Sequence, residues 1–505
     1  MKTITKAILV CVLMLTFSCQ NDDDSAIETP VNTSVNFQYK STIHVGGEGA
    51  AEISAYDSMS KKLFITNSES NVVSVYNIEN LETPVQETAI NLNTYGAPNS
   101  VSVYNGKLAV AVEAAVKQNL GKVLVYNATN LSLLKEYTVG ALPDMVTFSK
   151  DGNLIVCANE GEPNDDYTVD PVGSVSIINI ADNNVTTLGF EAFNSQEATL
   201  EAQGFRVFGP GANLAKDVEP EYITISEDSK TAWVSLQENN GIAKVNLVSK
   251  TIEAIYPLGY KDYNQSGNAI DASDKDLETV LKNWNVKGIY QPDAIVAANI
   301  GGVEYIISAN EGDARDYNGF SEEERVEDLT LDVIAYPVSE DYQNEINLGR
   351  LKTTTTLGDT DNDNDIDQIY SYGARSFSIW SANGNLVYDS GDSIATETLA
   401  MTPNRFNDDD KRSDDKGAEP ESVEVLNIEN QRYILFVGLE RTDQVMVYDI
   451  TNPLSPTFLT ILSHSGDEAP EGLLVIPAVK SPTGKDLLVV SNEDSGTVSF
   501  YENQQ

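Results

Sequence analysis

The chain has little of the chemistry on which most enzymes depend. Its 505 residues include two histidines, His44 and His464, and three cysteines. Two imidazoles are too few for a histidine-based zinc site or for a relay repeated along the chain. The sequence also lacks a P-loop, a G-x-S-x-G elbow and a G-x-G-x-x-G turn after a strand. Any catalysis would therefore use carboxylates and a metal ion.

Positive charge is scarce as well. Lysine and arginine total 32 against 77 aspartates and glutamates, which gives a formal net charge of −45. A surface this acidic repels nucleic acid and anionic lipid, and it favours cations. We therefore expect no nucleic-acid partner.

Long apolar runs are confined to residues 1–18. Lys2 and Lys6 precede an apolar stretch too short to span a bilayer, which is typical of a secretory signal peptide. The segment ends in "LTFSCQNDDDS", which resembles the lipobox of a Gram-negative lipoprotein and makes Cys19 the lipidated residue. We expect residues 19–35 to be an acidic flexible tether of an outer-membrane lipoprotein, exposed at the cell surface or otherwise facing the periplasm. The alternative is ordinary cleavage beside a chance cysteine.

The cysteines follow from this leader. Cys11 is removed with it and Cys19 carries lipid, so no intramolecular disulfide is expected without Cys19. Cys157 lies in the apolar run "LIVCAN", where we expect a small buried packing residue.

A hairpin pattern recurs along the rest of the chain. In "LPDMVTFSKDGNLIVCANEG" an acid opens the first apolar run and another follows the second, with a turn between them. Seven copies occur; six have an acid at the first position and six at the second. Copies without an insertion begin 45 to 50 residues apart and usually include a third apolar run. The paired positions are Glu52/Ser68, Asn99/Glu113, Asp144/Glu160, Glu221/Glu238, Asp293/Glu311, Glu421/Glu440 and Glu471/Glu493.

This repeat predicts an all-β, seven-bladed β-propeller over residues 36–505, because each copy supplies three or four short strands. The last copy supplies only three strands, and we expect the spare segment 35–45 to complete that blade and close the ring. An eight-bladed alternative would use "SFSIWSANGNLVYDSG" as a degenerate blade. Long insertions are expected at 181–216, 254–290 and 312–420.

The two acids of each hairpin should meet at one rim of the central channel, because both ends of a hairpin lie on the same side. A dry ring of ionised carboxylates needs compensation. One interpretation is that each acid accepts hydrogen bonds from the adjacent blade. The other is a metal site, with Ca²⁺ preferred by oxygen ligands. The candidate ligands are Glu160, Glu221, Asp293, Glu311, Glu421 and Glu471.

Four cationic residues accompany the insertions near this rim: Arg315, Arg375, Arg412 and Lys416. They are candidates for binding an anionic substrate such as phosphate. The alternative is that they pair with the acids.

A second metal motif lies in "GDTDNDNDIDQIYSYG". Its alternating acids, Asp359, Asp361, Asp363, Asp365 and Asp367, match the oxygen ligands of an EF-hand-like calcium loop. Asn364 stands where a left-handed turn residue, usually glycine, is needed. Tyr370 replaces the usual twelfth-position glutamate, so a bidentate ligand must come from elsewhere. The alternative is a solvated acidic turn without an ion.

Several longer motifs carry a family resemblance: "ANEGEPNDDYTVDPVGSVSIINI", "RVFGPGANLAKDVEPEYITISEDSKTAWVSLQENN", "ANEGDARDY", "GARSFSIW" and "RSDDKGAEPESV". On these motifs, residues 40–503 resemble the choice-of-anchor I family of bacterial extracellular proteins. They are also similar to the mesenchyme-specific cell surface glycoproteins of animals. The resemblance implies a secreted propeller held at the cell by an anchor, and it transfers no catalytic residue.

These patterns favour a lipid-anchored, calcium-binding propeller that acts as a monomeric binding or scaffold module for an extracellular ligand. The membrane would be contacted only through the N-terminal lipid. The alternative is a calcium-dependent phosphoesterase, similar to propeller phytases and alkaline phosphatases, acting on a phosphorylated small molecule.

Overall fold

We describe residues 32–504 in a computed structural model of the chain; the predicted signal peptide, Cys19 and most of the tether lie outside these residues. The recurring hairpin folds as an antiparallel sheet. One example is β11 (Pro143–Phe148), β12 (Leu154–Asn159), β13 (Ser174–Asn179) and β14 (Asn184–Leu188), in that order. The strand β11 is partly buried, whereas β12 is almost wholly buried. This explains the nearly continuous apolar run "LIVCAN" in the second strand, because a strand covered on both faces needs no polar alternation.

Six further sheets repeat this plan. The first three comprise β2 (Ser54–Asp57), β3 (Lys62–Asn67), β4 (Val72–Asn77), β5 (Val85–Gln86) and β6 (Ile90–Asn91); β7 (Pro98–Tyr104), β8 (Lys107–Val112), β9 (Leu120–Asn127) and β10 (Leu133–Ala141); and β15 (Ile223–Ile225), β16 (Thr231–Leu236), β17 (Gly241–Asn246) and β18 (Thr251–Pro257). The other three comprise β21 (Ile295–Ile300), β22 (Val303–Asn310), β28 (Ser376–Ser381) and β29 (Leu386–Asp389); β30 (Pro420–Ile428), β31 (Arg432–Leu439), β32 (Gln444–Asp449) and β33 (Thr457–Leu462); and β34 (Pro470–Ile476), β35 (Leu487–Asn492), β36 (Thr497–Asn503) and β1 (Phe37–His44).

The first strands of these sheets form a closed circle. In chain order β2, β7, β11, β15, β21, β30 and β34 each contact the next, and β34 contacts β2. The hydrophobic core lies between neighbouring sheets. This arrangement confirms the predicted all-β propeller class, while seven as the number of blades stays our prediction.

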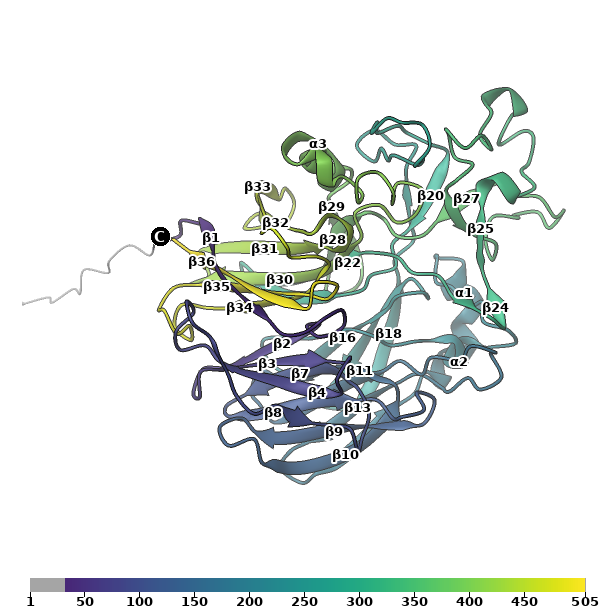
Figure 1. The fold of residues 1–505 in the computed structure, drawn as a ribbon. Coiled ribbons are helices and arrows are strands. Elements are labelled where there is room, and N and C mark those ends of the chain that lie inside the picture. Colours follow the sequence, from purple (N-terminus) through teal and green to yellow (C-terminus); the bar gives the residue numbers. More distant parts are fainter. Residues whose placement is uncertain (1–31, 505) are drawn as a thin grey trace, which may run out of the picture. The chain divides into compact units, whose positions relative to one another are not determined.

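Closure by the N-terminal strand is also observed. The strand β1 pairs antiparallel with β36, from Phe37 opposite Asn503 to His44 opposite Thr497, and the two lie side by side in Figure 1. The last sheet thus joins both ends of the described chain, which removes a free sheet edge.

The segment that suggested an eighth blade does not form a separate blade. Residues 376–391 contain β28 and β29, and β28 pairs with β22 along its whole length, with Asn310 opposite Ser376. The segment therefore completes the sheet begun by β21 and β22. It is distant from them in sequence because residues 311–375 intervene.

A separate sheet lies outside the circle, in the order β19 (Tyr260–Asp262), β20 (Val286–Ile289), β27 (Ile369–Ser371), β26 (Lys352–Thr354) and β25 (Glu323–Arg325). Its β20 and β27 run parallel, and β23 (Asp316–Tyr317) and β24 (Phe320–Ser321) form a small hairpin. Helices are short: α1 (Glu197–Glu201), α2 (Leu214–Asp217), α3 (Ser393–Met401) and the 3₁₀ turns η1 (Glu191–Gln196), η2 (Val326–Asp328), η3 (Val338–Glu340), η4 (Pro403–Arg405) and η5 (Glu440–Thr442). Over residues 32–504, none of the helices has the length and apolar content needed to cross a membrane.

Cys157 is fully buried in β12, among Val146, Phe148 and Ile178. It is therefore a packing residue, as its position in the apolar run predicts.

Candidate functional site

Three of the proline-acid pairs of the repeat lie at β-bulges and line the central channel. Pro143 pairs with Asn159, yet Val146 pairs with Cys157, so β11 carries one extra residue at this point. The same one-residue shift follows Pro420 in β30 and Pro470 in β34. A bulge re-aims a side chain, and proline is tolerated there because its missing N–H breaks no regular ladder. The repeat thus places its acid by backbone geometry.

The first strands enclose a central cavity of about 630 Å³. Its wall has a strong excess of negative charge, with two lysines, Lys150 and Lys480, as its cationic residues. The structure brings together here all six channel candidates from the sequence, and it adds four further acids. The acidic lining residues are Asp144, Glu160, Glu221, Glu238, Asp293, Glu311, Asp313, Glu421, Glu424 and Glu471.

These carboxyls hold their protons more tightly than free acids do. Burial raises the pKa of Glu221 well above its usual range, and the nearby Glu238 and Glu160 raise it further. Burial likewise raises the pKa of Asp144 to about 7, although Lys117 opposes the shift. Burial also raises the pKa of Glu238 to about 7 against the influence of Arg315. Crowded acids in a poorly hydrated wall favour protonation or the arrival of a cation.

Four of the channel glutamates have an oxygen that is buried and makes no hydrogen bond within the described structure: Oε2 of Glu221, Glu238, Glu421 and Glu471. Glu221 and Glu238 are each only 7% exposed. A buried, unpaired carboxylate oxygen is costly. The hydrogen-bonded interpretation, in which adjacent blades satisfy every acid, therefore does not account for these four.

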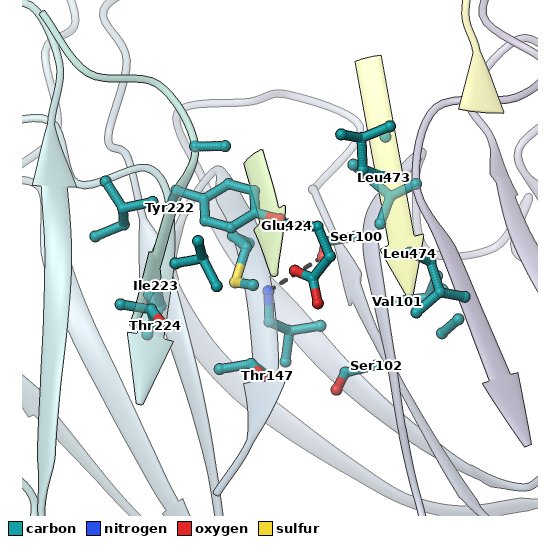
Figure 2. A pocket seen from close by; sticks show the side chains of 18 of the residues that line it. Ser100, Val101, Ser102, Thr147, Tyr222, Ile223, Thr224, Glu424, Leu473 and Leu474 are labelled. Atoms are coloured by element: carbon teal, nitrogen blue, oxygen red, sulfur yellow. Dashed lines mark hydrogen bonds between the residues drawn. The ribbon is translucent and has the colours of Figure 1, made fainter. Parts of the chain in front are cut away.

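One acid lies deeper in the channel. Glu424 follows Glu421 by three residues in β30, and its side chain lies beside Tyr222, Ser100 and Leu473 (Figure 2). Burial raises the pKa of Glu424 to about 7, and Lys150 opposes the shift. Sequence analysis missed this residue, although a glutamate inside the apolar strand "SVEVL" was a visible signal.

A different arrangement occurs at one side of the rim, which we call the rim cluster: Glu311, Glu419 and Glu440, whose oxygens lie within 4.8 Å of one another. Lys416 Nζ lies 2.5 Å from Glu311 Oε1 and 3.4 Å from Glu419 Oε2. Arg412 and Arg441 contact Glu419 at 2.6 and 3.3 Å. Burial alone would raise the pKa of Glu419, but these three cations hold it below its ordinary value. The charge of Glu419 is thus balanced by the protein itself, whereas burial raises the pKa of Glu311 and raises that of Glu440 to about 8.

The four cationic candidates are engaged in internal contacts. Arg315 is buried and pairs with Asp217 and Glu219 at 2.8 and 2.9 Å. The buried Arg375 donates to the backbone carbonyl groups of Asp271, Ser413 and Asp415. Arg412 and Lys416 pair with acids of the rim cluster. The geometry therefore favours pairing over anion binding for all four.

The predicted calcium loop has the expected turn. Asp359 accepts hydrogen bonds at 3.1 Å from the backbone N–H groups of both Asp363 and Asn364, and Asn364 adopts a φ of 74°. Oxygens of Asp359, Asp361 and Asp367 lie within 4.8 Å of one another. The Asp363 carboxylate raises the pKa of Asp361. A cation at this point would relieve that repulsion.

Sequence analysis missed Asp332. A parallel bridge between Leu331 and Ile366 places it against the loop, and its oxygen lies within 4.8 Å of oxygens of Asp365 and Asp367. One oxygen of Asp365, Oδ1, is buried and lacks a hydrogen-bond partner. Asp332 thus adds a carboxylate from outside the loop, which Tyr370 cannot supply. No local pattern could reveal it, because the contact joins segments more than thirty residues apart.

The circle of sheets and its channel define a β-propeller with an acidic central cavity. The model of the choice-of-anchor I domain matches residues 52–453, and the chain belongs to this family. The predicted family is therefore confirmed.

Two curated relatives resemble parts of the chain. Gigasin-3a of Magallana gigas is 35% identical over 189 residues, which cover 32% of this chain and 66% of the relative. A mesenchyme-specific cell surface glycoprotein of Strongylocentrotus purpuratus is 25% identical over 370 residues, covering 63% of this chain and 46% of the relative. The chain thus spans about two thirds and about half of their lengths. The family and the second relative's name indicate association with the cell surface or the extracellular space.

Two solved structures resemble the chain. Hydrazine synthase of Kuenenia stuttgartiensis has a TM-score of 0.50 at 12% identity, covering 92% of this chain and 99% of the matched chain. The β-propeller domain of Cps50 (Swd1) from Myceliophteria thermophila gives a TM-score of 0.47 at 8% identity, with the same coverage. At these identities the first likeness concerns the fold alone.

Proposed function

We propose that the protein is a lipid-anchored, calcium-binding module of the cell surface, which binds an extracellular ligand in its central channel. The carrying observation is the 630 Å³ cavity, whose wall presents buried carboxylate oxygens without internal partners. A cavity of this size matches those that hold small molecules. The family and the relative's cell-surface name support the location.

Calcium would bind at the loop 359–367. Asp359, Asp361 and Asp367 supply oxygens from one side, and Asp332 with Asp365 from the other. Hard oxygen ligands of this kind suit Ca²⁺. The lipid would be carried by Cys19, outside the described residues.

The hydrolase alternative receives no support. A metal-dependent phosphoesterase needs carboxylates that converge on one open metal position and a free cation for the phosphate. Within residues 32–504, none of the three convergent acid groups includes Glu160, Glu221, Asp293, Glu421 or Glu471. The cationic candidates are held in the internal contacts described above.

Calcium titration of the ectodomain tests the loop. We expect Asp361→Asn and Asp332→Asn each to weaken Ca²⁺ binding by about tenfold or more, because each removes a charged ligand. Isothermal titration calorimetry measures the affinity, with Asp182→Asn, an exposed turn residue elsewhere, as the matched control. Unchanged affinity in both loop variants would show that calcium binds elsewhere or not at all.

Fractionation of cells tests the anchor. Cys19→Ser should move the protein from the membrane fraction to the soluble fraction, whereas Cys157→Ser should leave it in place. Retention of the Cys19→Ser protein with the membrane would contradict the lipid proposal.

A further inference from the structure

We propose that the central channel binds a linear aliphatic polyamine, with one ammonium group near Glu221 and Glu238 and another beside Glu424. This inference deepens the proposed function and rests on it, because it names the ligand class of the binding module. A polyamine combines several positive charges with short apolar segments, and the channel presents the complementary pattern.

The charge of the ligand follows from the charged residues that line the cavity. Ten acids and two lysines line the cavity. An anion entering this channel would meet repulsion in a confined space of low dielectric constant, whereas a cation is attracted. The ligand must therefore be positively charged.

The spacing of the acids argues for more than one charge. A single metal ion requires oxygens gathered around one point, and within the described residues the convergent group at the rim is already paired with Lys416, Arg412 and Arg441. The remaining channel acids lie in β11, β30 and β34, in the segments that precede β15 and β21, and in the segments that follow β12, β16 and β22, around the cavity wall. An extended cation can meet several of these acids at once.

Two buried oxygens fix one end of the ligand. Glu221 and Glu238 are each 7% exposed, and Oε2 of each lacks a hydrogen-bond partner. An ammonium group donates up to three hydrogen bonds, so it can satisfy both oxygens at once. It would also compensate the mutual repulsion of the two carboxylates.

Glu424 gives the channel a second acidic position. It follows Glu421 by three residues in β30, past the bulge that follows Pro420. Apolar side chains, including Tyr222 and Leu473, lie among polar ones in the wall beside Glu424 (Figure 2). Methylene segments suit this wall, and a second ammonium group would reach Glu424.

Calorimetric titration of the ectodomain with spermidine at neutral pH and physiological ionic strength tests the proposal. Butylamine provides one charge on a similar chain, and a neutral aliphatic diol provides none. We expect spermidine to bind about 100-fold more tightly than butylamine, which corresponds to about 2.7 kcal/mol, and the diol not to bind. Glu221→Gln and Glu424→Gln should each weaken spermidine binding about tenfold or more, whereas the exposed Glu278→Gln should not. Thermal melts of the variants check that they fold.

The opposing outcomes are distinct. Equal spermidine binding by Glu278→Gln and both channel variants would show surface attraction only and overturn the proposal. A second pair of results would also overturn it: stoichiometric Ca²⁺ abolishes spermidine binding, and Glu424→Gln leaves the spermidine affinity unchanged. The channel would then hold a metal at its mouth. If calcium titration at the loop succeeds while spermidine fails, the calcium-binding module stands and only its ligand class is wrong.

Discussion

Two acidic regions of the same channel differ in how their charge is balanced. In the rim cluster, Glu419 is fully buried and contacts Lys416, Arg412 and Arg441. Around Glu221 and Glu238, buried oxygens have no such partner. The pKa values follow this difference, since that of Glu419 is lowered and that of Glu221 is raised. Burial is common to both, and three neighbouring cations outweigh it at Glu419, whereas one pairing each leaves the pKa of Glu311 raised and that of Glu440 raised to about 8.

The comparison separates a structural role from a binding role. A carboxylate surrounded by its own cations stabilises the fold and has little left to offer a ligand. A buried carboxylate without them destabilises the ionised protein, and a ligand cation would remove that cost. The channel acids near Glu221 are therefore the residues that we assign to binding.

Removing a charge from the rim cluster should have the largest effect. Glu419→Gln leaves three cations without their shared partner, and breaking a buried charge network typically costs about 3 kcal/mol. Urea denaturation at neutral pH should show this loss in the free energy of unfolding. The exposed Glu278→Gln, measured alongside, should stay within about 0.5 kcal/mol of the unmodified protein. A Glu419→Gln protein as stable as this control would mean that the rim cluster is not a stabilising network.

The repeat made much of this arrangement predictable. Alternating apolar runs with turns at short spacing specify hairpins. In five of the seven copies, "PD" or "PE" marks the beginning of the first strand at the channel. The spare segment 35–45 was identifiable because the last copy lacked a strand. These features are local in sequence or repeat along it, so a single chain reveals them.

Contacts between distant segments were not predictable. The strand β28 follows β22 only after a long insertion, which made residues 376–391 look like a separate blade. Asp332 reaches the calcium loop through one parallel bridge. The burial of Arg315 against Asp217 and Glu219 likewise depends on tertiary packing. The residue types of an acidic ring were visible in the sequence, but which acids form ion pairs with lysine or arginine was not.

An intermediate effect is expected from pH. The pKa values of Asp144 and Glu238 are raised to about 7 in the folded protein, whereas free acids titrate near 4. Between these values the folded state binds more protons than the unfolded state, so stability falls as the pH rises from about 4 to about 7. We expect both groups to lower the free energy of unfolding across this window.

The measurement is the free energy of unfolding at several pH values, without added cations. The double variant Asp144→Asn/Glu238→Gln should lose this part of the pH dependence, because neither replacement titrates. The two proteins should diverge steadily across this window, with the double variant more stable at the alkaline end. Parallel pH profiles would contradict the assignment of raised pKa values to the channel.

The smallest effect, and the one of opposite sign to the rim variant, is expected at Glu221. At about pH 8, Glu221→Gln removes an ionised carboxylate that faces Glu238 and Glu160 without an internal cation, and this should stabilise the protein by about 1 kcal/mol. At about pH 4, where the wild-type carboxyl is protonated and neutral, the variant should match the unmodified protein. Chemical denaturation at the two pH values measures both differences. Destabilisation at the higher pH would place Glu221 in a network like that of Glu419, and the contrast between the two regions would then disappear.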